Sequence, residues 1–154
     1  MVMKKFFTTF GLFLLMLVAN AQKENPKYNQ TLADSLGADK YGMKMYTLVI
    51  LKTGKNDLAD KAKRDSLFRG HLSNIGRLAN EGKLIVAGPL KKNDKNYEGI
   101  FILNVQTDTE AIKLLETDPA INAKLLDVEL FQWYGSAALP LYLSYHDNVK
   151  KVDF

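Results

Sequence analysis

The sequence contains no cysteine and only two histidines, His71 and His146, among its 154 residues. Without cysteine the chain has no disulfide, no thiol nucleophile and no cysteine for lipid attachment. Two histidines are too few to build a histidine-rich metal cluster within one chain. A glycine-rich phosphate loop and the HExxH and GxSxG motifs are also missing. We therefore expect neither a metal nor a cofactor.

The sequence also lacks a strong excess of one charge. It has 21 basic and 17 acidic residues, a formal net charge of +4. Lys4 and Lys5 lie in the first few residues, and without them the net charge is only +2. No stripe of basic residues alternates with aromatic ones, so we expect no binding to nucleic acid.

Long hydrophobic runs are missing as well. The longest, residues 6–18, has roughly 13 residues, whereas a helix needs ~20 to span a bilayer. Lys4 and Lys5 precede this run, and the small-x-small triplet Ala19-Asn20-Ala21 follows it. This order is typical of an export signal cleaved before Gln22, so we expect no stable membrane anchor and a periplasmic or secreted mature protein. Residues 22–43 are polar and without a period, and we interpret them as a flexible N-terminal lead.

Hydrophobic periodicity divides residues 45–133 into strands and helices. The predicted elements are a strand at 45–51, a helix at 60–80, strands at 84–87 and 99–105, a short helix after Thr107, a helical turn at 120–123 and a strand at 125–133. Gly82 is placed to end the long helix, and Thr107 with Glu110 has the spacing of a capping box. A polar turn joins the second and third strands into a predicted hairpin.

The order β-α-β-β-α-β predicts an α+β fold of the ferredoxin-like type, an antiparallel sheet with both helices on one face. Residues of both parities are apolar in the strand at 45–51. A sheet whose second face is also apolar needs a cover. A second copy of the chain is the simplest cover, so we expect a homodimer with the two sheets face to face.

Two residues have both a structural and a chemical interpretation. His71 lies at helical spacing between Leu67 and Ile75, so it points toward the sheet. There it is either a core residue with one hydrogen bond or a site residue, and an imidazole suits acid–base work near neutral pH. Asp118 precedes a proline, and capping the following turn would by itself explain its presence.

These residues form a pattern that resembles the YCII-related (YciI-like) family. The resemblance covers residues 45 to about 134 and is carried by Arg69-Gly70-His71-Leu72, Ala87-Gly88-Pro89-Leu90 and Asp118-Pro119-Ala120. It implies a dimeric α/β barrel in which His71 and Asp118 form a catalytic pair in a cleft. We expect Arg69, Gly88 and Pro89 in the wall of this cleft. In some relatives such a pair is linked with hydrolytic removal of chlorine from an aromatic ring.

The chain therefore divides into a signal peptide (1–21), a flexible lead (22–43), a YCII-like domain (44–134) and a C-terminal extension (135–154). The leading hypothesis for its function is cofactor-free acid–base chemistry, hydrolase-like or isomerase-like, on a small organic molecule. Two other hypotheses stay open: a binding module without catalysis, and a structural dimer in which His71 and Asp118 only close a buried hydrogen bond. The extension is apolar at residues 137–143, so it is expected to pack on its own sheet edge or on the partner subunit.

Overall fold

The computed structural model describes residues 25–152. The predicted export signal and the first residues of the predicted lead lie outside the described residues. Within the described part of the chain, no helix combines the length and the apolar character that crossing a membrane requires.

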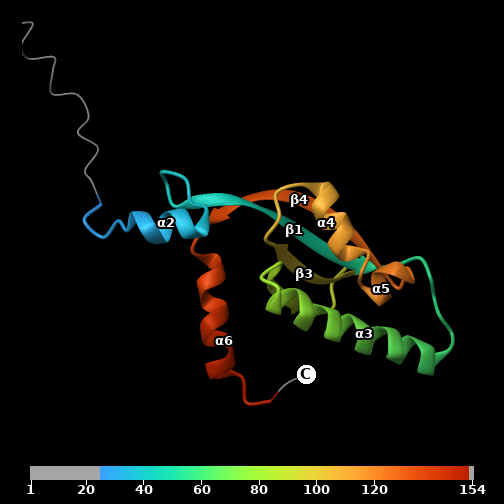
Figure 1. The fold of residues 1–154 in the computed structure, drawn as a ribbon. Helices are drawn as coiled ribbons and strands as arrows, with labels where there is room; N and C mark the ends of the chain where they lie inside the picture. The colour runs from blue at the N-terminus through green and yellow to red at the C-terminus, as the bar shows by residue number, and fades with distance from the viewer. Residues whose placement is uncertain (1–24, 153–154) are drawn as a thin grey trace, which may run out of the picture. The chain divides into compact units, whose positions relative to one another are not determined.

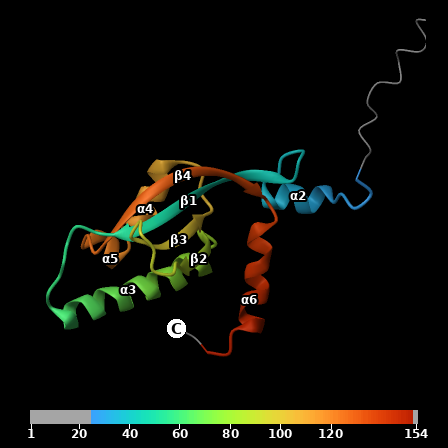
Figure 2. The same ribbon diagram turned by 180° about the vertical axis from the view of Figure 1, so that it is seen from behind.

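The described chain forms a four-stranded antiparallel sheet with helices, seen from two sides in Figures 1 and 2. The elements are α2 (Gln30–Leu36), β1 (Met43–Thr53), α3 (Lys61–Asn80), β2 (Leu84–Pro89), β3 (Tyr97–Leu103), α4 (Asp108–Leu115), α5 (Pro119–Asn122), β4 (Leu126–Ser136), the 3-10 helix η2 (Leu139–Tyr142) and α6 (Leu143–Val149). The strand order is β2-β3-β1-β4. The predicted α+β, ferredoxin-like fold is confirmed.

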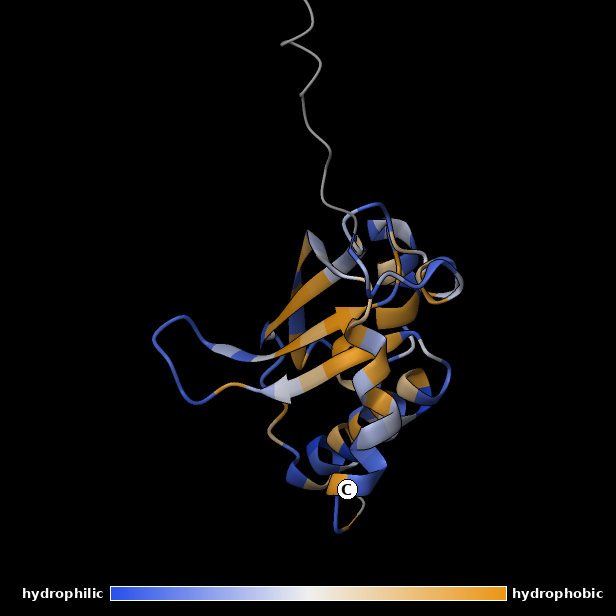
Figure 3. Cartoon of the chain, turned by 90° about the vertical axis from the view of Figure 1, so that its left-hand side faces the viewer, coloured by the Kyte–Doolittle hydropathy of each residue, from blue (hydrophilic) through white to orange (hydrophobic). Residues whose placement is uncertain are grey.

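The hydrophobic core lies between one face of the sheet and the helices α3, α4 and α5. Val49 and Phe101 are paired across β1 and β3 and point into this core, where both are almost completely buried. The helices contribute Leu78, Leu115 and Ile121 to the same cluster. All three helices therefore cover the same face of the sheet, and hydrophobic residues run along the strands, as the colouring in Figure 3 shows.

The opposite sheet face, here called the open face, is also apolar. It includes Leu48, Ile50, Ile100, Ile102, Phe131 and Trp133. Leu48 pairs with Phe131 on one side and with Ile102 on the other, and directly paired residues share one face of an antiparallel sheet. Phe131 is 50% exposed on this surface. The open face is the second apolar surface that the alternation in β1 predicts.

The region interpreted as a flexible lead contains a short helix, α2, and the first residue of β1. Gly37 adopts a left-handed conformation with φ of 68° directly after α2. The amide of Ala38 donates to the carbonyl of Ala33, and the amide of Gly37 to that of Asp34, a pattern that closes a helix C-terminus. The glycine was the sequence signal for this helix. None of the residues of α2 is buried, and Ala33 and Leu36 are the two that are partly covered.

The C-terminal extension is attached to its own sheet. β4 continues to Ser136, and the amide of Ala137 donates to the carbonyl of Gly42. The hydroxyl of Tyr142 in η2 donates to the carbonyl of Ile85 in β2, an edge strand. The extension was expected to pack either on its own sheet edge or on a partner subunit. The contact between Tyr142 and Ile85 lies at the edge of its own sheet.

Candidate functional site

His71 lies in the second half of α3, on the side of the helix that faces the sheet. Asp60 caps the start of α3 by accepting a hydrogen bond from the amide of Lys63. The ring of His71 is 5.9 Å from that of Phe101 in a stacked arrangement, and Phe68 meets it edge-on at 6.2 Å. With 8% exposure, the residue is held between the helix and the sheet rather than in solvent.

Asp118 lies at the start of α5 and is 1% exposed. One of its carboxylate oxygens, Oδ1, accepts hydrogen bonds from the amides of Ala120 and Ile121 at 2.9 and 3.3 Å. The other oxygen, Oδ2, is 2.7 Å from Nδ1 of His71. The capping role and the pairing role that the sequence left as alternatives are thus filled by the two oxygens of one carboxylate.

The hydrogen bonds of Asp118 determine its charge. Burial acts to raise the pKa of this carboxyl, but the hydrogen bond and the charge of His71, with the amides of Ile121 and Ala120, outweigh burial and hold the pKa below its usual value. Asp118 is therefore ionised at neutral pH and can only accept hydrogen bonds. The proton between the two side chains must be on Nδ1 of His71, and in the neutral ring Nε2 then carries a free lone pair.

This Nε2 atom is accessible to solvent. In the described part of the chain no buried side-chain nitrogen or oxygen lacks a hydrogen-bond partner, and the only hydrogen bond of the His71 ring is through Nδ1. Since Nε2 has no partner, it is not buried. His71 also lines the large cleft described below. An oriented, accessible imidazole nitrogen can take up or deliver a proton.

The two residues come together because Gly70 allows α3 and α5 to approach closely. A Cβ atom at Gly70 would lie 2.8 Å from Cγ of Pro119, closer than packed carbon atoms come. Pro119 directly follows Asp118, so this contact determines how near the carboxylate comes to His71. A second polar link joins α3 to the same turn, because Arg77 donates to Asn74 at 2.8 Å and to Thr117 at 2.9 Å.

We expect Gly70→Ala to weaken the pair. The added methyl group must displace the ring of Pro119, which should lower the free energy of unfolding by about 1–3 kcal/mol. Gly76→Ala is the matched control, because Gly76 lies in the same helix with nothing within 4 Å of an added Cβ. That variant should be more stable by about 0.5–1 kcal/mol, since alanine favours helix more than glycine does. Urea unfolding measures the free energy of unfolding of both variants. A change of the same sign and size in the two would contradict the close packing of Gly70 against Pro119.

A cleft of about 1410 Å³ lies beside His71. Its walls come mainly from α3, from β2 and β3, and from the C-terminal extension; the wall residues from α3 include Phe68, Arg69, Leu72 and Ile75. Arg69, Gly88 and Pro89, the three predicted wall residues, all line it. Asp118 is not in the lining, so it lies behind His71 rather than in contact with the contents of the cleft.

The C-terminal extension supplies wall residues that the sequence did not indicate: Tyr142, Leu143, His146, Asp147 and Lys150. Nothing in the local sequence places this segment beside α3, because its position depends on contacts with β2 about 57 residues away. The apolar run at 137–143 was a sign only that the segment packs somewhere.

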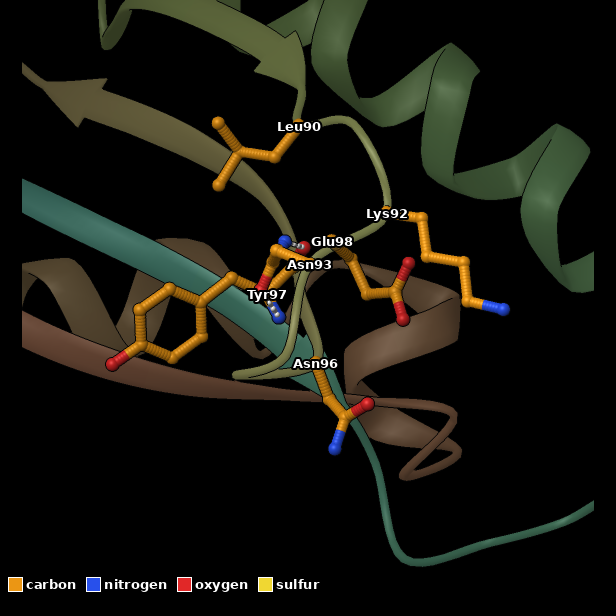
Figure 4. A pocket seen from close by; sticks show the side chains of 6 residues that line it. All are labelled: Leu90, Lys92, Asn93, Asn96, Tyr97 and Glu98. Atoms are coloured by element: carbon orange, nitrogen blue, oxygen red, sulfur yellow. Dashed lines mark hydrogen bonds between the residues drawn. The ribbon is translucent and has the colours of Figure 1, made fainter.

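A smaller hollow of about 360 Å³ lies in the loop between β2 and β3, shown with its side chains in Figure 4. Asn93 uses its amide to hold this loop, donating to the carbonyl of Tyr97 and accepting from the amides of Lys95 and Tyr97. These hydrogen bonds give Asn93 a structural role in the loop, so its presence there needs no ligand. No group of three or more acidic or metal-binding side chains suited to an ion occurs among residues 25–152.

The fold and the cleft define a small ferredoxin-like α+β domain with a buried histidine–carboxylate pair at one wall. The family model described as "YCII-related domain" matches residues 45–134. The chain belongs to this family, and the matched range includes both His71 and Asp118. The extension with η2 and α6 lies beyond the match.

Among solved structures, the chain is similar to 5-chloro-2-hydroxyhydroquinone dehydrochlorinase (TftG) from Burkholderia phenoliruptrix AC1100, in complex with 2,5-dihydroxybenzoquinone. The identity is 21%, the TM-score is 0.41, and the alignment covers 56% of this chain and 92% of that one. No curated protein matches the chain.

Proposed function

We propose that this chain carries out cofactor-free acid–base chemistry, hydrolase-like or isomerase-like, on a small organic molecule bound in the cleft beside His71. The observation that carries the proposal is the 2.7 Å hydrogen bond between Nδ1 of His71 and a carboxylate that is buried and ionised. His71 is the general base or acid, because Nε2 is the atom open to the cleft. Asp118 is a positioning residue, which fixes the tautomer and ring orientation of His71.

The cleft supports a mainly apolar ligand. Phe68 and Leu72 are 38% and 49% exposed and line it from α3, with Tyr142 and Leu143 in its wall from the extension. Arg69, two residues before His71 in α3, also lines the cleft, and its guanidinium suits an anionic or carbonyl group on such a molecule. We propose export of the mature chain, residues 22–154, which favours a reaction that needs no intracellular cofactor.

We also propose that the protein is a homodimer that buries the open face. Family membership and the apolar character of both sheet faces support this arrangement. Within the open face, Lys52 and Glu129 pair at 2.6 Å, which neutralises the two charges that a partner would cover.

The proposed chemistry is tested with 4-nitrophenyl acetate, a small, mainly apolar ester. In the assayed step, water attacks the acyl carbon while Nε2 of His71 accepts a proton from the water, and the ester bond breaks with release of coloured 4-nitrophenolate. We expect the mature protein to exceed an equal concentration of free imidazole, and His71→Ala to lower the rate about 100-fold. Absorbance of the released 4-nitrophenolate measures the rate.

Tyr145→Phe is the control, because Tyr145 is 68% exposed and does not line the cleft. It should retain the full rate. A His71→Ala protein as fast as the parent would exclude catalysis by His71. If the parent shows no rate above imidazole but retains a small molecule in native mass spectrometry, the alternative of a binding module is the better one.

A further inference from the structure

The C-terminal extension has a position in the site that family membership does not explain. The matched family domain ends at residue 134, yet η2 and α6 supply a wall of the cleft that contains His71. The extension therefore adds a wall to the cleft, and the other walls come from the matched family domain.

One side chain anchors this wall. The hydroxyl of Tyr142 donates to the carbonyl of Ile85. Ile85 is the residue at which the pairing of β2 with β3 shifts register, since Leu84 pairs with Leu103 and Val86 with Ile102. Such a bulge leaves the extra residue outside the regular ladder. Burial raises the pKa of Tyr142, so its hydroxyl keeps the proton that it donates at neutral pH.

The rest of the wall is only lightly packed. Neither η2 nor α6 contains a buried residue. Tyr145 and Val149 in α6 are 68% and 80% exposed, and Leu143 is the residue of α6 that is partly covered. Segments with few buried apolar contacts open at a small fraction of the global unfolding free energy. Because η2 and α6 are lightly packed and held by the hydrogen bond of Tyr142, they can open and close while the sheet stays intact.

We propose that η2 and α6 form an adjustable wall that controls which small, mainly apolar molecules reach Nε2 of His71, with Tyr142 as its anchor and Leu143 as its contact surface. This inference rests on the proposed function, because a wall beside His71 matters only if molecules react or bind there. What the experiment measures is the accessibility of the His71 ring. A molecule of the right size fits below the closed wall, whereas a larger one reaches His71 only when the anchor is released.

The test uses diethyl pyrocarbonate, which transfers an ethoxycarbonyl group to an unprotonated imidazole nitrogen with release of ethanol and carbon dioxide. Peptide mapping by mass spectrometry gives the modification rate of His71 alone. We expect Tyr142→Phe to raise this rate about fivefold, the change in an opening equilibrium on loss of one net hydrogen bond. Tyr145→Phe is the matched control in the adjoining helix α6, outside the cleft lining, and should leave the rate unchanged.

Leu143→Ala is the second variant, and it should also raise the rate of His71 modification while leaving the circular dichroism and melting temperature of the sheet domain unchanged. An unchanged His71 rate in both variants would overturn the proposal, as would an equal increase in Tyr145→Phe. The readout needs no substrate. The modification rate of His71 therefore tests the adjustable wall, whereas the ester assay tests the proposed catalysis, and either can fail without the other.

Discussion

Asp118→Ala is expected to lower the free energy of unfolding by about 2–4 kcal/mol, the largest stability effect of any single side chain at the site. The substitution removes the acceptor of three hydrogen bonds at once: from Nδ1 of His71 and from the amides of Ala120 and Ile121. All of these contacts are buried, so water cannot readily replace the carboxylate. Urea unfolding followed by circular dichroism measures the loss. A change below about 0.5 kcal/mol would contradict the buried pairing.

Asp118→Asn separates the capping role from the positioning role. The oxygen of the introduced side-chain amide can still accept from the two backbone amides of α5, which leaves its NH₂ group facing Nδ1 of His71. Nδ1 must then accept rather than donate, so the ring proton moves to Nε2 and the free base in the cleft is lost. We expect a smaller stability loss than for alanine, together with loss of esterase activity.

The tautomer itself can be observed. In the parent the ¹⁵N chemical shifts of the neutral His71 ring should identify Nδ1 as the protonated nitrogen, and in Asp118→Asn they should identify Nε2. A residue with a purely structural role would change stability without exchanging the two ring nitrogens. The same tautomer in both proteins would therefore contradict positioning by Asp118, even if stability fell.

The stabilisation from Asp118 also depends on pH in a direction that its lowered pKa determines. The usual pKa of this carboxyl is 3.8, and the folded protein holds it lower. A carboxyl with a lowered native pKa contributes its full stabilisation above its unfolded value and loses it as the pH falls through its native value. The stability advantage of the parent over Asp118→Asn should therefore shrink as the pH falls below about 4. A constant difference down to pH 2 would contradict this assignment.

Phe131→Glu is expected to convert a dimer into a monomer. Phe131 is 50% exposed on the open face, beside Leu48 of the neighbouring strand. In a face-to-face dimer it would lie in the interface, where a carboxylate without a partner costs several kcal/mol. Sedimentation of the mature chain at micromolar concentration measures the mass, which should fall by half in the variant.

Ile112→Glu provides the matched control for the dimer. Ile112 is 45% exposed in α4, on the helix side of the domain, so the same change of an exposed apolar residue to glutamate should leave the dimer intact. A parent protein that sediments as a monomer at micromolar concentration would exclude the dimer proposal. Dissociation of both variants would show that glutamate acts through general destabilisation rather than through the open face.

The local elements were predictable because their signals lie within a few residues of each other. The hydroxyl of Thr107 accepts from the amide of Glu110 and donates to its carboxylate, which confirms Thr107 as the N-cap of α4, although the carboxylate bonds to the hydroxyl rather than to the backbone amide that a capping box uses. Gly82 follows α3 with φ of 66°, as expected for a glycine that ends a helix. Periodicity likewise placed α3 to within one residue at its start, and the strand boundaries to within three residues. Each of these features is decided by backbone geometry and by contacts at short range in the sequence.

Other features could not be predicted from local pattern. The sequence of residues 139–149 shows an apolar run followed by polar residues, and nothing in it specifies Ile85 as a partner. The wall that Tyr142 and Leu143 add to the cleft follows from that one long-range contact. The helix α2 was missed for a different reason, because it is only seven residues long and its clearest end signal is the single glycine Gly37.

The sequence by itself determined the order of strands and helices, the apolar character of both sheet faces, and the presence of a histidine facing the sheet. Only the tertiary structure decided that His71 and Asp118, 47 residues apart, are hydrogen-bonded. The physical reason is the close contact between Gly70 and Pro119, since the separation of two packed helices depends on the size of the side chains between them. The tertiary structure also decided that His71 lines a cleft to which the C-terminal extension contributes part of the wall.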